Sequence, residues 1–330
     1  MIEPASIRRI LIVSLDNLGD LVFASALSSP LHDAFPQAAI DVWSKRYTAP
    51  VALLIPHVQA VIAADPFWAA SPGQPSAGML TFLRSVRDVR RKRYDAAVLS
   101  QAPWRCAAAV AAAGIPVRIG FARRHNARFL THVVRQEDSS KPVLEEQARL
   151  LAPFGIEAAR LRYRLEVAPL EDRRRALAER LPRRFVAFHP FAGSRDRCVA
   201  LTEWTQLAFA LEARRMRVLW VGTTAELNEL RLSHTHPLGA YVDQLGSPSL
   251  STTAAALSLA TAFVGHDSGP LHVAGALGVP VLGVFAPGQP ARTFPQGAGP
   301  SRMLARPGPD AIDASIMLRE LETLGLFSDA

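Results

Sequence analysis

The sequence predicts an α/β protein made of two doubly wound, Rossmann-like domains. Its 330 residues are enough for two domains of ordinary size, each with its own core. Short apolar runs rich in β-branched residues alternate with helical patterns, which is typical of βα units and a parallel sheet, and this alternation occurs once in each half. Hydrophobic residues make up 49% and charged residues 20% of the chain, values too apolar for a disordered protein.

In the first half, five apolar runs predict strands and two periodic segments predict helices. The helices are expected at Leu21–Phe35 and Met79–Arg91, the second with Leu80, Leu83 and Val86 on its apolar side and its arginines exposed. The strands are expected at Ile10–Leu15, Ile40–Trp43, Val58–Ala63, Ala96–Ser100 and Val117–Gly120.

The second half repeats the pattern after a charged helix at Glu171–Arg180. Because Pro169 precedes this helix and Pro182 follows it, we expect the domain boundary there, with domains at 1–168 and 169–330. The strands are expected at Phe185–His189, Val218–Val221, Ala262–Gly265 and Val281–Phe285. The helices are expected at Trp204–Ala213, Ser251–Leu259 and Leu271–Leu277.

No segment of the sequence has the pattern of a membrane span or a secretory signal. The longest mostly apolar segment, Cys106–Val117, is too short to cross a bilayer as a helix. Arg8 and Arg9 precede only four apolar residues, so we expect a cytoplasmic protein. Cys106 and Cys198 are far apart and form no CxxC motif, so neither a disulfide framework nor a structural zinc site is indicated.

Positive charge is concentrated in the first half of the chain. Residues 1–170 hold 21 Lys and Arg against 14 Asp and Glu, a net charge of +7, whereas residues 171–330 hold 16 against 15, a net of +1. Such an excess attracts phosphates, nucleic acid or an anionic membrane surface. For the run at 84–93 we favour a solvated helix face. The run at 118–135 has no clear apolar stripe, so we expect it to face a ligand.

Several chemistries have no motif in this sequence. GxGxxG, GxxxxGK[ST] and HExxH are all absent from the chain. No Asp-x-Asp pair occurs either, and such paired carboxylates are what many transferases use to hold a divalent cation on a diphosphate. The sequence therefore favours a mechanism without a metal ion.

The turn after the first predicted strand is the first candidate site. Gly19 permits a sharp turn from strand to helix, and Asp20 then falls near the N-terminus of the next helix, where ligands of such sheets bind. A carboxylate there could accept a proton from a substrate hydroxyl, or it could cap the helix. Asp16 could serve either role instead.

The turn after the strand at 262–265 is suited to an anion. Pro270 fits the first turn of the following helix, while Ser268 and Gly269 allow a phosphate to approach the backbone closely. A hydrolytic alternative would recruit Ser268, His272 and Asp267 as a triad. We disfavour it, because the sequence is not GxSxG and three members in one helical turn do not line up readily. His272 is then expected to pack or cap.

Two further turns in the second half carry polar groups suited to a nucleotide. Gly193 and Ser194 can cradle an anion, and Arg195 or Arg197 can supply a permanent cation to a diphosphate. After the next strand, Glu226 could accept two hydrogen bonds from a ribose diol, or it could be an ordinary acid at a helix N-terminus.

Together, these segments resemble the family nine glycosyltransferases, the ADP-heptose:lipopolysaccharide heptosyltransferases. The resemblance covers nearly the whole chain, and it lies in three motifs. They are ILIVSLDNLGDLVFASAL near the start, RIGF followed by an Arg-rich stretch and LTHVV in the middle, and FVGHDSGPLHVAGALGVPVLGVFAP near the end. The resemblance implies a GT-B fold, with two Rossmann-like domains facing across a cleft. It places the acceptor on the N-terminal domain and the nucleotide sugar on the C-terminal domain.

The resemblance also assigns roles to individual positions. Asp20 matches the proposed catalytic base, Glu226 the acid that holds the ribose, and Arg197 the position of a phosphate-binding Lys. The expected donor-binding residues are Gly193, Ser194, Arg197, Glu226, Asp267, Ser268, Gly269, Pro270 and Leu271. The expected acceptor-binding residues are Asp16, Gly19, Arg118, Arg123, Arg124 and Arg128. No metal ligand and no cofactor is expected.

The chain departs from the family pattern at three places. Val199–Leu201 stand where the family has Trp and Pro, and Ala286–Gln289 replace its Gly-Pro-Thr-Asp, which bears on the choice of donor. Ala26 replaces a Pro of the first helix, and Pro30 appears instead, where it is expected to kink the helix.

The resemblance implies an inverting, metal-independent transfer of heptose or a related sugar. The donor would be an ADP-sugar and the acceptor an anionic glycolipid, the lipopolysaccharide inner core, reached by peripheral contact with the inner face of the cytoplasmic membrane. One alternative is a transferase of the same fold with another nucleotide sugar and a polysaccharide, protein or small-molecule acceptor. A distant alternative is a non-catalytic nucleotide or nucleic-acid binding protein. Nucleic acid is disfavoured because aromatic residues make up only 7% of the chain.

Overall fold

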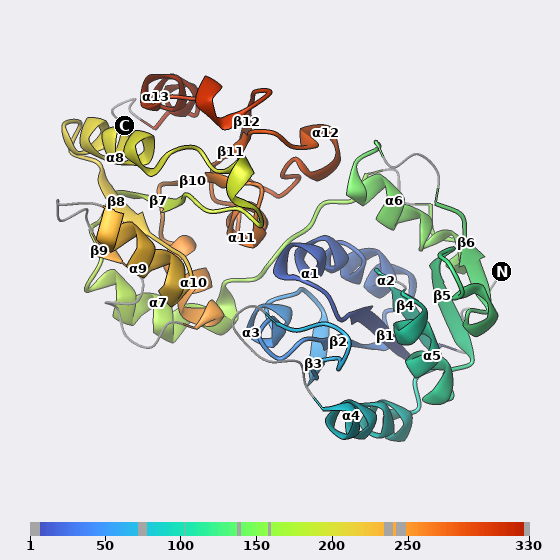
Figure 1. The fold of residues 1–330 in the computed structure, drawn as a ribbon. Helices are drawn as coiled ribbons and strands as arrows, with labels where there is room; N and C mark the ends of the chain where they lie inside the picture. Colours follow the sequence, from blue (N-terminus) through green and yellow to red (C-terminus); the bar gives the residue numbers. More distant parts are fainter. Residues whose placement is uncertain are drawn as a thin grey trace. The chain divides into compact units, whose positions relative to one another are not determined.

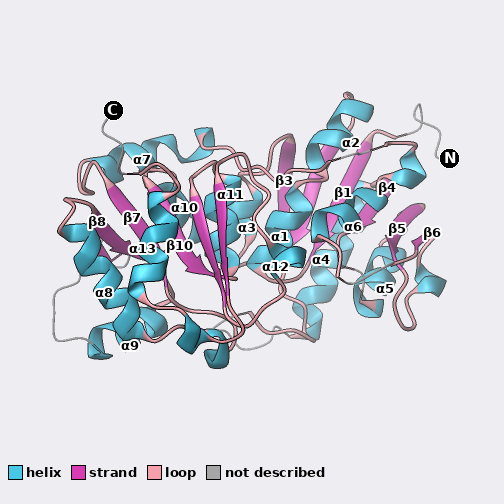
Figure 2. Cartoon of the chain, turned by 90° about the horizontal axis from the view of Figure 1, so that it is seen from above, coloured by secondary structure: helices cyan, strands magenta, loops and turns pink. Residues whose placement is uncertain are grey.

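The computed structural model contains two parallel-sheet α/β units (Figure 1). It describes residues 7–71, 78–101, 103–136, 140–157, 160–233, 240–241 and 249–326. Each unit has a six-stranded sheet in which all neighbouring strands are parallel, and helices cover the sheet (Figure 2). Within the described residues, no helix is long and apolar enough to span a membrane.

The first unit holds the sheet β3-β2-β1-β4-β5-β6. Its strands are β1 (Arg9–Ser14), β2 (Ala39–Ser44), β3 (Val58–Ala63), β4 (Ala96–Leu99), β5 (Val117–Phe121) and β6 (His132–Val134). Its helices are α1 (Leu18–Ser25), α2 (Ser28–Ala34), α3 (Ala49–Ala52), α4 (Met79–Lys92), α5 (Trp104–Ala112) and α6 (Val143–Arg149). On one face of the sheet α4 and α5 enclose a core in which the Trp43 and Phe82 rings stack at 5.5 Å.

The second unit repeats this order as β12-β11-β10-β7-β8-β9. Its strands are β7 (Phe185–His189), β8 (Arg217–Trp220), β9 (Ala240–Tyr241), β10 (Ala262–His266), β11 (Val281–Phe285) and β12 (Ser301–Ala305). Its helices are α7 (Glu171–Ala178), α8 (Leu201–Glu212), α9 (Thr224–Ser233), α10 (Leu250–Leu257), α11 (Gly269–Ala276), α12 (Pro290–Thr293) and α13 (Ala314–Glu322). In its core, the Phe188 ring contacts Trp204 of α8 and Trp220 of β8, each edge to face.

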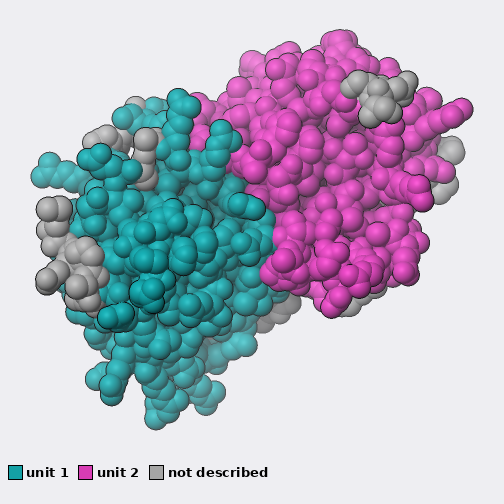
Figure 3. All heavy atoms as spheres, turned by 180° about the vertical axis from the view of Figure 1, so that it is seen from behind, with its two compact units in different colours: residues 1–166 teal, residues 167–330 magenta. Residues whose placement is uncertain are grey.

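The chain passes from the first unit to the second between Glu166 and Val167 (Figure 3). This is two residues before the boundary expected from the flanking prolines. The Glu166 N–H donates to the carbonyl of Leu54 at 2.7 Å, which ties this residue to the first unit. A 3-10 turn at Ala168–Leu170 then leads directly into α7 of the second unit.

The single helix predicted at 21–35 is wrong, because the chain forms two helices there. α1 ends at Ser25, and α2 begins at Ser28, two residues before Pro30. A proline ring clashes with the carbonyl four residues earlier and offers no N–H, so Pro30 disfavours a continuous helix through Ala26. The break lies where the sequence predicted a kink.

The predicted apolar stripe of the helix at 79–91 is wrong for Leu80 and Leu83, whereas Val86 is buried as expected. Leu80 and Leu83 are 71% and 50% exposed, whereas the side buried in α4 consists of Phe82, Ser85, Val86 and Val89. Phe82 sets this orientation, because its ring packs against Trp43 and against Trp68. Two leucines are therefore left on the arginine-rich outer face.

Three edge strands were missed in the sequence. β6 and β12 have no continuous apolar run, because most of their side chains are only partly buried or exposed. β9 is two residues long. Short edge strands with exposed side chains carry a weak sequence signal, and they also reduce edge-to-edge association.

Candidate functional site

Each sheet reverses its strand order at one point, and the predicted site residues follow the strands at those points. In the first unit the reversal lies between β1 and β4, and in the second unit between β7 and β10. Open parallel sheets bind ligands beyond the carboxyl ends of the strands at this reversal. The turns that carry Asp20, His189 and Asp267 therefore occupy the expected binding edges.

Asp20 lies in the first turn of α1, one position beyond Gly19, and is half-buried. The N-cap of this helix is Asn17, and the backbone N–H of Asn17 donates to Asp16 Oδ1 at 3.0 Å. The Asn17 side chain makes no capping hydrogen bond, and Asp20 lies within the first turn rather than at the N-cap position. Burial raises the pKa of the Tyr47 phenol, and the charges of Asp16 and Asp20 raise this pKa further, so the phenol keeps its proton.

Gln101 joins Asp20 to Arg123 through its carboxamide. The Nε2 of Gln101 donates to Asp20 Oδ1 at 3.4 Å, and its Oε1 accepts a hydrogen bond from Arg123 Nη2 at 2.9 Å. The arginine can only donate, so it fixes which end of the amide faces the carboxylate. These three side chains follow β1, β4 and β5, which are neighbours in the sheet.

Buried amide side chains hold the loops that carry Gln101 and Arg123. Gln147 of α6 donates to both the carbonyl and the hydroxyl of Ser100, at 3.2 and 3.1 Å, and so fixes the end of β4 next to Gln101. Asn126 donates to the Phe121 carbonyl at 2.8 Å and accepts from the Arg123 N–H at 2.9 Å. The loops that carry Gln101 and Arg123 are therefore held by hydrogen bonds within the first unit.

The other arginines of the 118–135 run differ from one another. The Arg118 guanidinium donates to the carbonyls of Phe129, Ile115 and Pro116, so its geometry favours a structural role over the acceptor contact that we expected. Arg124 is exposed, and Arg128 lies over the Phe129 ring at 4.9 Å. Arg123 is the arginine of this run that hydrogen-bonds to Gln101 beside Asp20, and Arg124 follows it in the same turn.

In the second unit, Glu226 is an ionised carboxylate at the start of α9. The Thr223 backbone N–H and hydroxyl donate to its Oε2 at 2.7 and 2.8 Å, and His189 Nε2 lies 3.8 Å from the same oxygen. Burial would raise the pKa of Glu226, but the contacts with His189 and Thr223 outweigh it and lower this pKa to about 2. All these contacts fall on Oε2, so Oε1 can accept hydrogen bonds from a ligand.

His189, which ends β7, links two of the predicted donor turns. Its Nδ1 lies 3.0 Å from the hydroxyl of Ser268, the N-cap of α11, and its Nε2 faces Glu226. Ser268 therefore contacts His189 and not His272, and the Ser268, His272 and Asp267 relay of the hydrolytic alternative is not formed. In the sequence, the place of His189 at the end of a predicted strand is its one signal of a role.

The Asp267 carboxylate is held at both oxygens. His272 Nε2 lies 3.3 Å from Oδ1, and the Thr293 hydroxyl donates to Oδ2 at 3.0 Å. Thr293 is the last residue of α12, which follows the divergent loop at 286–289. Thr293 therefore helps to orient Asp267, a function that sequence reasoning missed.

The loop after β7 presents Gly193, Ser194 and Arg197, all of them exposed. Ser194 contacts Asp196, and Arg195 pairs with Glu229 at 2.7 Å, which leaves Arg197 as the cation better suited to a diphosphate. His266 holds the far end of this loop, because the Val199 N–H donates to its Nε2 at 3.1 Å.

His266 is neutral at physiological pH. Burial lowers its pKa to about 4, although its contact with the Val284 carbonyl acts in the opposite direction. Since Nε2 accepts from Val199, the proton sits on Nδ1, 3.2 Å from the Val284 oxygen. His266 is therefore a second histidine of this unit with a role that the sequence did not reveal.

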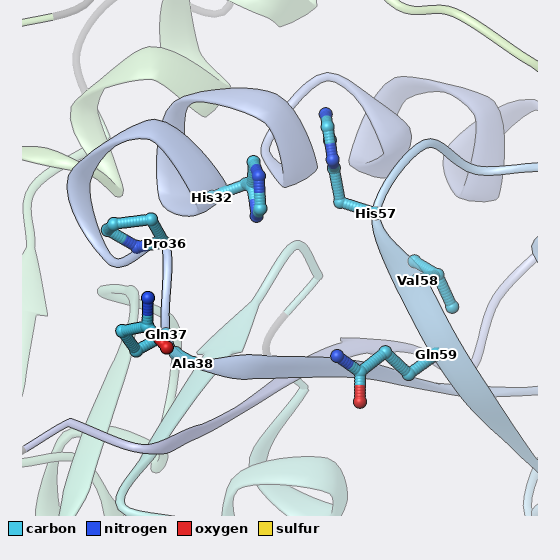
Figure 4. A pocket seen from close by; sticks show the side chains of 7 residues that line it. All are labelled: His32, Pro36, Gln37, Ala38, His57, Val58 and Gln59. Carbon is cyan, nitrogen blue, oxygen red and sulfur yellow. The ribbon is translucent and has the colours of Figure 1, made fainter.

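The first unit also has a pocket of about 400 Å³ (Figure 4). It is lined by His32, Pro36, Gln37, Ala38, His57, Val58 and Gln59. The His32 and His57 rings stack at 4.0 Å. Because this pocket adjoins the amino ends of β2 and β3, it is not part of the binding edge.

A comparison with family models matches residues 82–305 to glycosyltransferase family 9 (heptosyltransferase). The chain belongs to this glycosyltransferase family. It is also 24% identical over 281 residues to lipopolysaccharide heptosyltransferase 3 from Escherichia coli, with 81% of the chain and 80% of that protein covered. The family resemblance of the sequence motifs is thereby confirmed, and the chain is a glycosyltransferase of the heptosyltransferase family.

Solved structures show the same GT-B fold. A family 9 glycosyltransferase from Veillonella parvula matches with a TM-score of 0.82 and 17% identity, covering 99% of both chains. The E. coli ADP-heptose lipopolysaccharide heptosyltransferase II matches with a TM-score of 0.80 and 22% identity, covering 98% of this chain and 100% of that one. The E. coli heptosyltransferase WaaC with ADP matches with a TM-score of 0.77 and 18% identity, covering 96% and 99%. The predicted fold class is confirmed.

The Gln101 bridge predicts that Gln101→Met slows sugar transfer without weakening donor binding. Methionine keeps the length of the side chain but loses the N–H toward Asp20 and the oxygen toward Arg123. We expect kcat to fall about tenfold, the size of one lost hydrogen bond to a charged group, with the KM for the donor unchanged. Gln37→Met, an exposed glutamine of the same unit, serves as the control. A full kcat in Gln101→Met would mean that the bridge has no role in transfer.

The neutral state of His266 predicts a loss of stability at moderately acid pH. Its pKa is lowered to about 4 in the folded chain, so below pH ~6.5 the unfolded chain takes up a proton first. The stabilising effect is complete above pH ~6.5 and is lost as the pH falls toward 4, by up to about 3 kcal/mol.

Urea unfolding followed by tryptophan fluorescence between pH 7 and about 4 measures this effect. His266→Gln, which keeps an acceptor and a donor but does not titrate there, should show a shallower pH dependence than the parent. Equal slopes for parent and variant would contradict the assignment. The pKa of Glu226 is lowered to about 2, so the stability that this carboxylate contributes is lost only as the pH falls below ~4.5. Most of that loss therefore lies below the pH range of the measurement.

Proposed function

We propose that this protein transfers heptose or a related sugar from an ADP-sugar to a hydroxyl of lipopolysaccharide inner core, with inversion and without a metal ion. The observation that carries the proposal is the Asp20–Gln101–Arg123 chain at the binding edge of the first unit. It places a carboxylate that can accept a proton next to a cation that can hold an anionic acceptor. The relatives support the substrate class, since heptosyltransferase 3 is named for lipopolysaccharide and the solved relatives for ADP and ADP-heptose.

In this mechanism Asp20 removes the proton from the acceptor hydroxyl as its oxygen attacks the anomeric carbon of the donor. The bond between that carbon and the diphosphate breaks on the opposite face, so the configuration inverts. Arg123 and Arg124 hold phosphates of the acceptor, and Asp16 and Gly19 line the same turn. Gln101 donates to the Asp20 carboxylate and so orients it at the binding edge of the sheet.

The second unit binds the donor in this proposal. The free oxygen of Glu226 accepts hydrogen bonds from the ribose, and Asp267 orients the sugar. Arg197, Gly193 and Ser194 approach the diphosphate, together with the α11 N-terminus formed by Ser268, Gly269, Pro270 and Leu271. Helix N–H groups and a guanidinium stabilise the charge that develops on the departing nucleoside diphosphate.

A metal ion has no assigned place in this mechanism. The sequence has no Asp-x-Asp pair, and the described part of the chain has no group of three or more His, Cys, Asp or Glu side chains that could hold one. In this mechanism Arg197 and the N-terminus of α11 stabilise the negative charge on the leaving diphosphate instead. No cofactor is needed, and the place of action is the cytoplasm, at the inner face of the membrane that carries the acceptor.

A transferase of the same fold with another nucleotide sugar and a different acceptor is the second candidate. The divergent loop at 286–289 favours it, because this loop leads directly into α12. Thr293 of α12 donates to the carboxylate of Asp267, one of the proposed donor-binding residues. A panel of ADP-, GDP- and UDP-sugars, scored by release of the nucleoside diphosphate, separates the two candidates.

The base assignment predicts that Asp20→Asn abolishes most turnover while ADP still binds. Asparagine keeps the shape of the side chain but is not a base, so we expect kcat with ADP-heptose and purified inner core to fall about 10² to 10⁴-fold. Calorimetry with ADP should give the parent Kd. Asp33→Asn, an exposed carboxylate on α2, is the control and should keep parent activity. Full turnover in Asp20→Asn would remove Asp20 from the chemistry.

The metal-free assignment predicts that EDTA leaves the initial rate unchanged. The rate is measured in protein dialysed against EDTA, then again after addition of magnesium or manganese. Loss of activity with EDTA and its recovery with either metal would overturn this part of the mechanism.

A further inference from the structure

The outer face of α4 carries apolar and basic side chains that the proposed chemistry does not use. We define the α4 surface as Met79, Leu80, Leu83, Arg84, Arg87 and Arg91. Met79, Leu80 and Leu83 are 56%, 71% and 50% exposed, and the three arginines are exposed as well. The helix lies at the margin of the first unit (Figure 1).

The apolar part of this surface lies at the same sheet edge as Asp20. α4 connects β3 to β4, and in such a crossover the helix begins near the carboxyl end of the first strand. Phe67, which follows β3, contacts the Phe82 ring of α4 at 6.1 Å and is itself 37% exposed. Trp104, 39% exposed, begins α5 three residues after Gln101, and Arg105 lies over its ring at 4.8 Å.

Exposed apolar groups are concentrated here. Of the ten large apolar side chains exposed among the described residues, five belong to this edge: Phe67, Met79, Leu80, Leu83 and Trp104. Single exposed leucines need no explanation, but a cluster at a binding edge marks an interaction surface.

The charge of the α4 surface is nearly unopposed. Asp88 is the one acid within α4 and pairs with Arg91 at 3.7 Å. Within the described residues, Arg84 and Arg87 have no carboxylate partner in ion-pair distance. A helix face with leucine and methionine side chains among arginines matches an interfacial helix, which inserts its apolar tips and attracts anionic headgroups.

We propose that the α4 surface docks the protein on an anionic phospholipid bilayer. The apolar side chains enter the interface, and the arginines contact the headgroup phosphates. Docking by this edge brings the bilayer next to Asp20 and Arg123, where a lipid-linked acceptor would need to be presented. That benefit rests on the proposed function, whereas the docking itself can be measured without any transfer.

Vesicle flotation with the full chain tests the docking. The parent should bind phosphatidylglycerol vesicles, and less phosphatidylcholine vesicles or vesicles at high salt. Leu80→Ser with Leu83→Ser should weaken binding about tenfold, and Arg84→Glu with Arg87→Glu about 30-fold or more. Two controls should bind as the parent does. They are Leu53→Ser, an equally exposed leucine of the same unit, and Arg175→Glu with Arg183→Glu, the same charge change in the second unit.

Three results would overturn the proposal. They are no binding of the parent to phosphatidylglycerol vesicles, equal losses in the controls, and a leucine variant that binds as the parent does while a single-stranded oligonucleotide displaces the protein. The last result would indicate a polyanion site rather than a lipid surface.

A transfer assay separates this proposal from the proposed function. The leucine variant should keep the parent rate on deacylated, water-soluble inner core and lose rate only on acceptor embedded in vesicles. A parent without any transfer would count against the proposed function, and the flotation result would still decide the docking. An equal loss on both acceptors would assign these leucines to the fold of the unit.

Discussion

The reversal of strand order in each sheet is the constraint on which the candidate site depends. At this reversal, the connections that follow two neighbouring strands run in opposite directions. Their loops separate and leave an open crevice at the carboxyl ends of the strands. Asp20 and Gln101 stand at the reversal between β1 and β4, while His189 and Asp267 stand at the reversal between β7 and β10. Each pair is distant in sequence and adjacent only because of the sheet order.

Much of the fold could be predicted from local sequence because the central strands are buried on both faces. The strands at 185–189 and 281–285 have the predicted bounds, since continuous apolar runs end where polar turns begin. Prediction failed at three of the four edge strands, β6, β9 and β12, and where tertiary contacts decide, whereas the edge strand β3 has the predicted bounds. The edge strands β6 and β12 have few buried side chains. The buried face of α4 is set by Phe82 against Trp43, a partner far away along the chain.

The site was predicted less completely, and the reason is also physical. Turn residues such as Asp20, Glu226 and Asp267 could be named as candidates, because glycine, proline and acids directly after a strand predict a turn at the binding edge of the sheet. Gln101, His189, His266 and Thr293 act through partners on other strands and helices, and a single glutamine, histidine or threonine predicts no partner. Arg118 shows the converse, since its charge suggested a ligand while its donors hold three backbone carbonyls. The electrostatics agree with this division. The first unit links Arg123 to the Asp20 carboxylate through Gln101, and the second holds a half-buried, ionised Glu226 and a buried, neutral His266.

Hydrogen–deuterium exchange of the whole protein with and without ADP is the most direct test that the two reversals serve different substrates. We expect ADP to slow exchange in the turns at 189–197, 222–227 and 267–271 of the second unit, where His189, Glu226 and Ser268 converge. The turns at 15–21, 99–101 and 121–126 should exchange at their unliganded rates. Protection of those first-unit turns by ADP, with none at Glu226 and Ser268, would contradict the assignment of donor and acceptor to the two sheets.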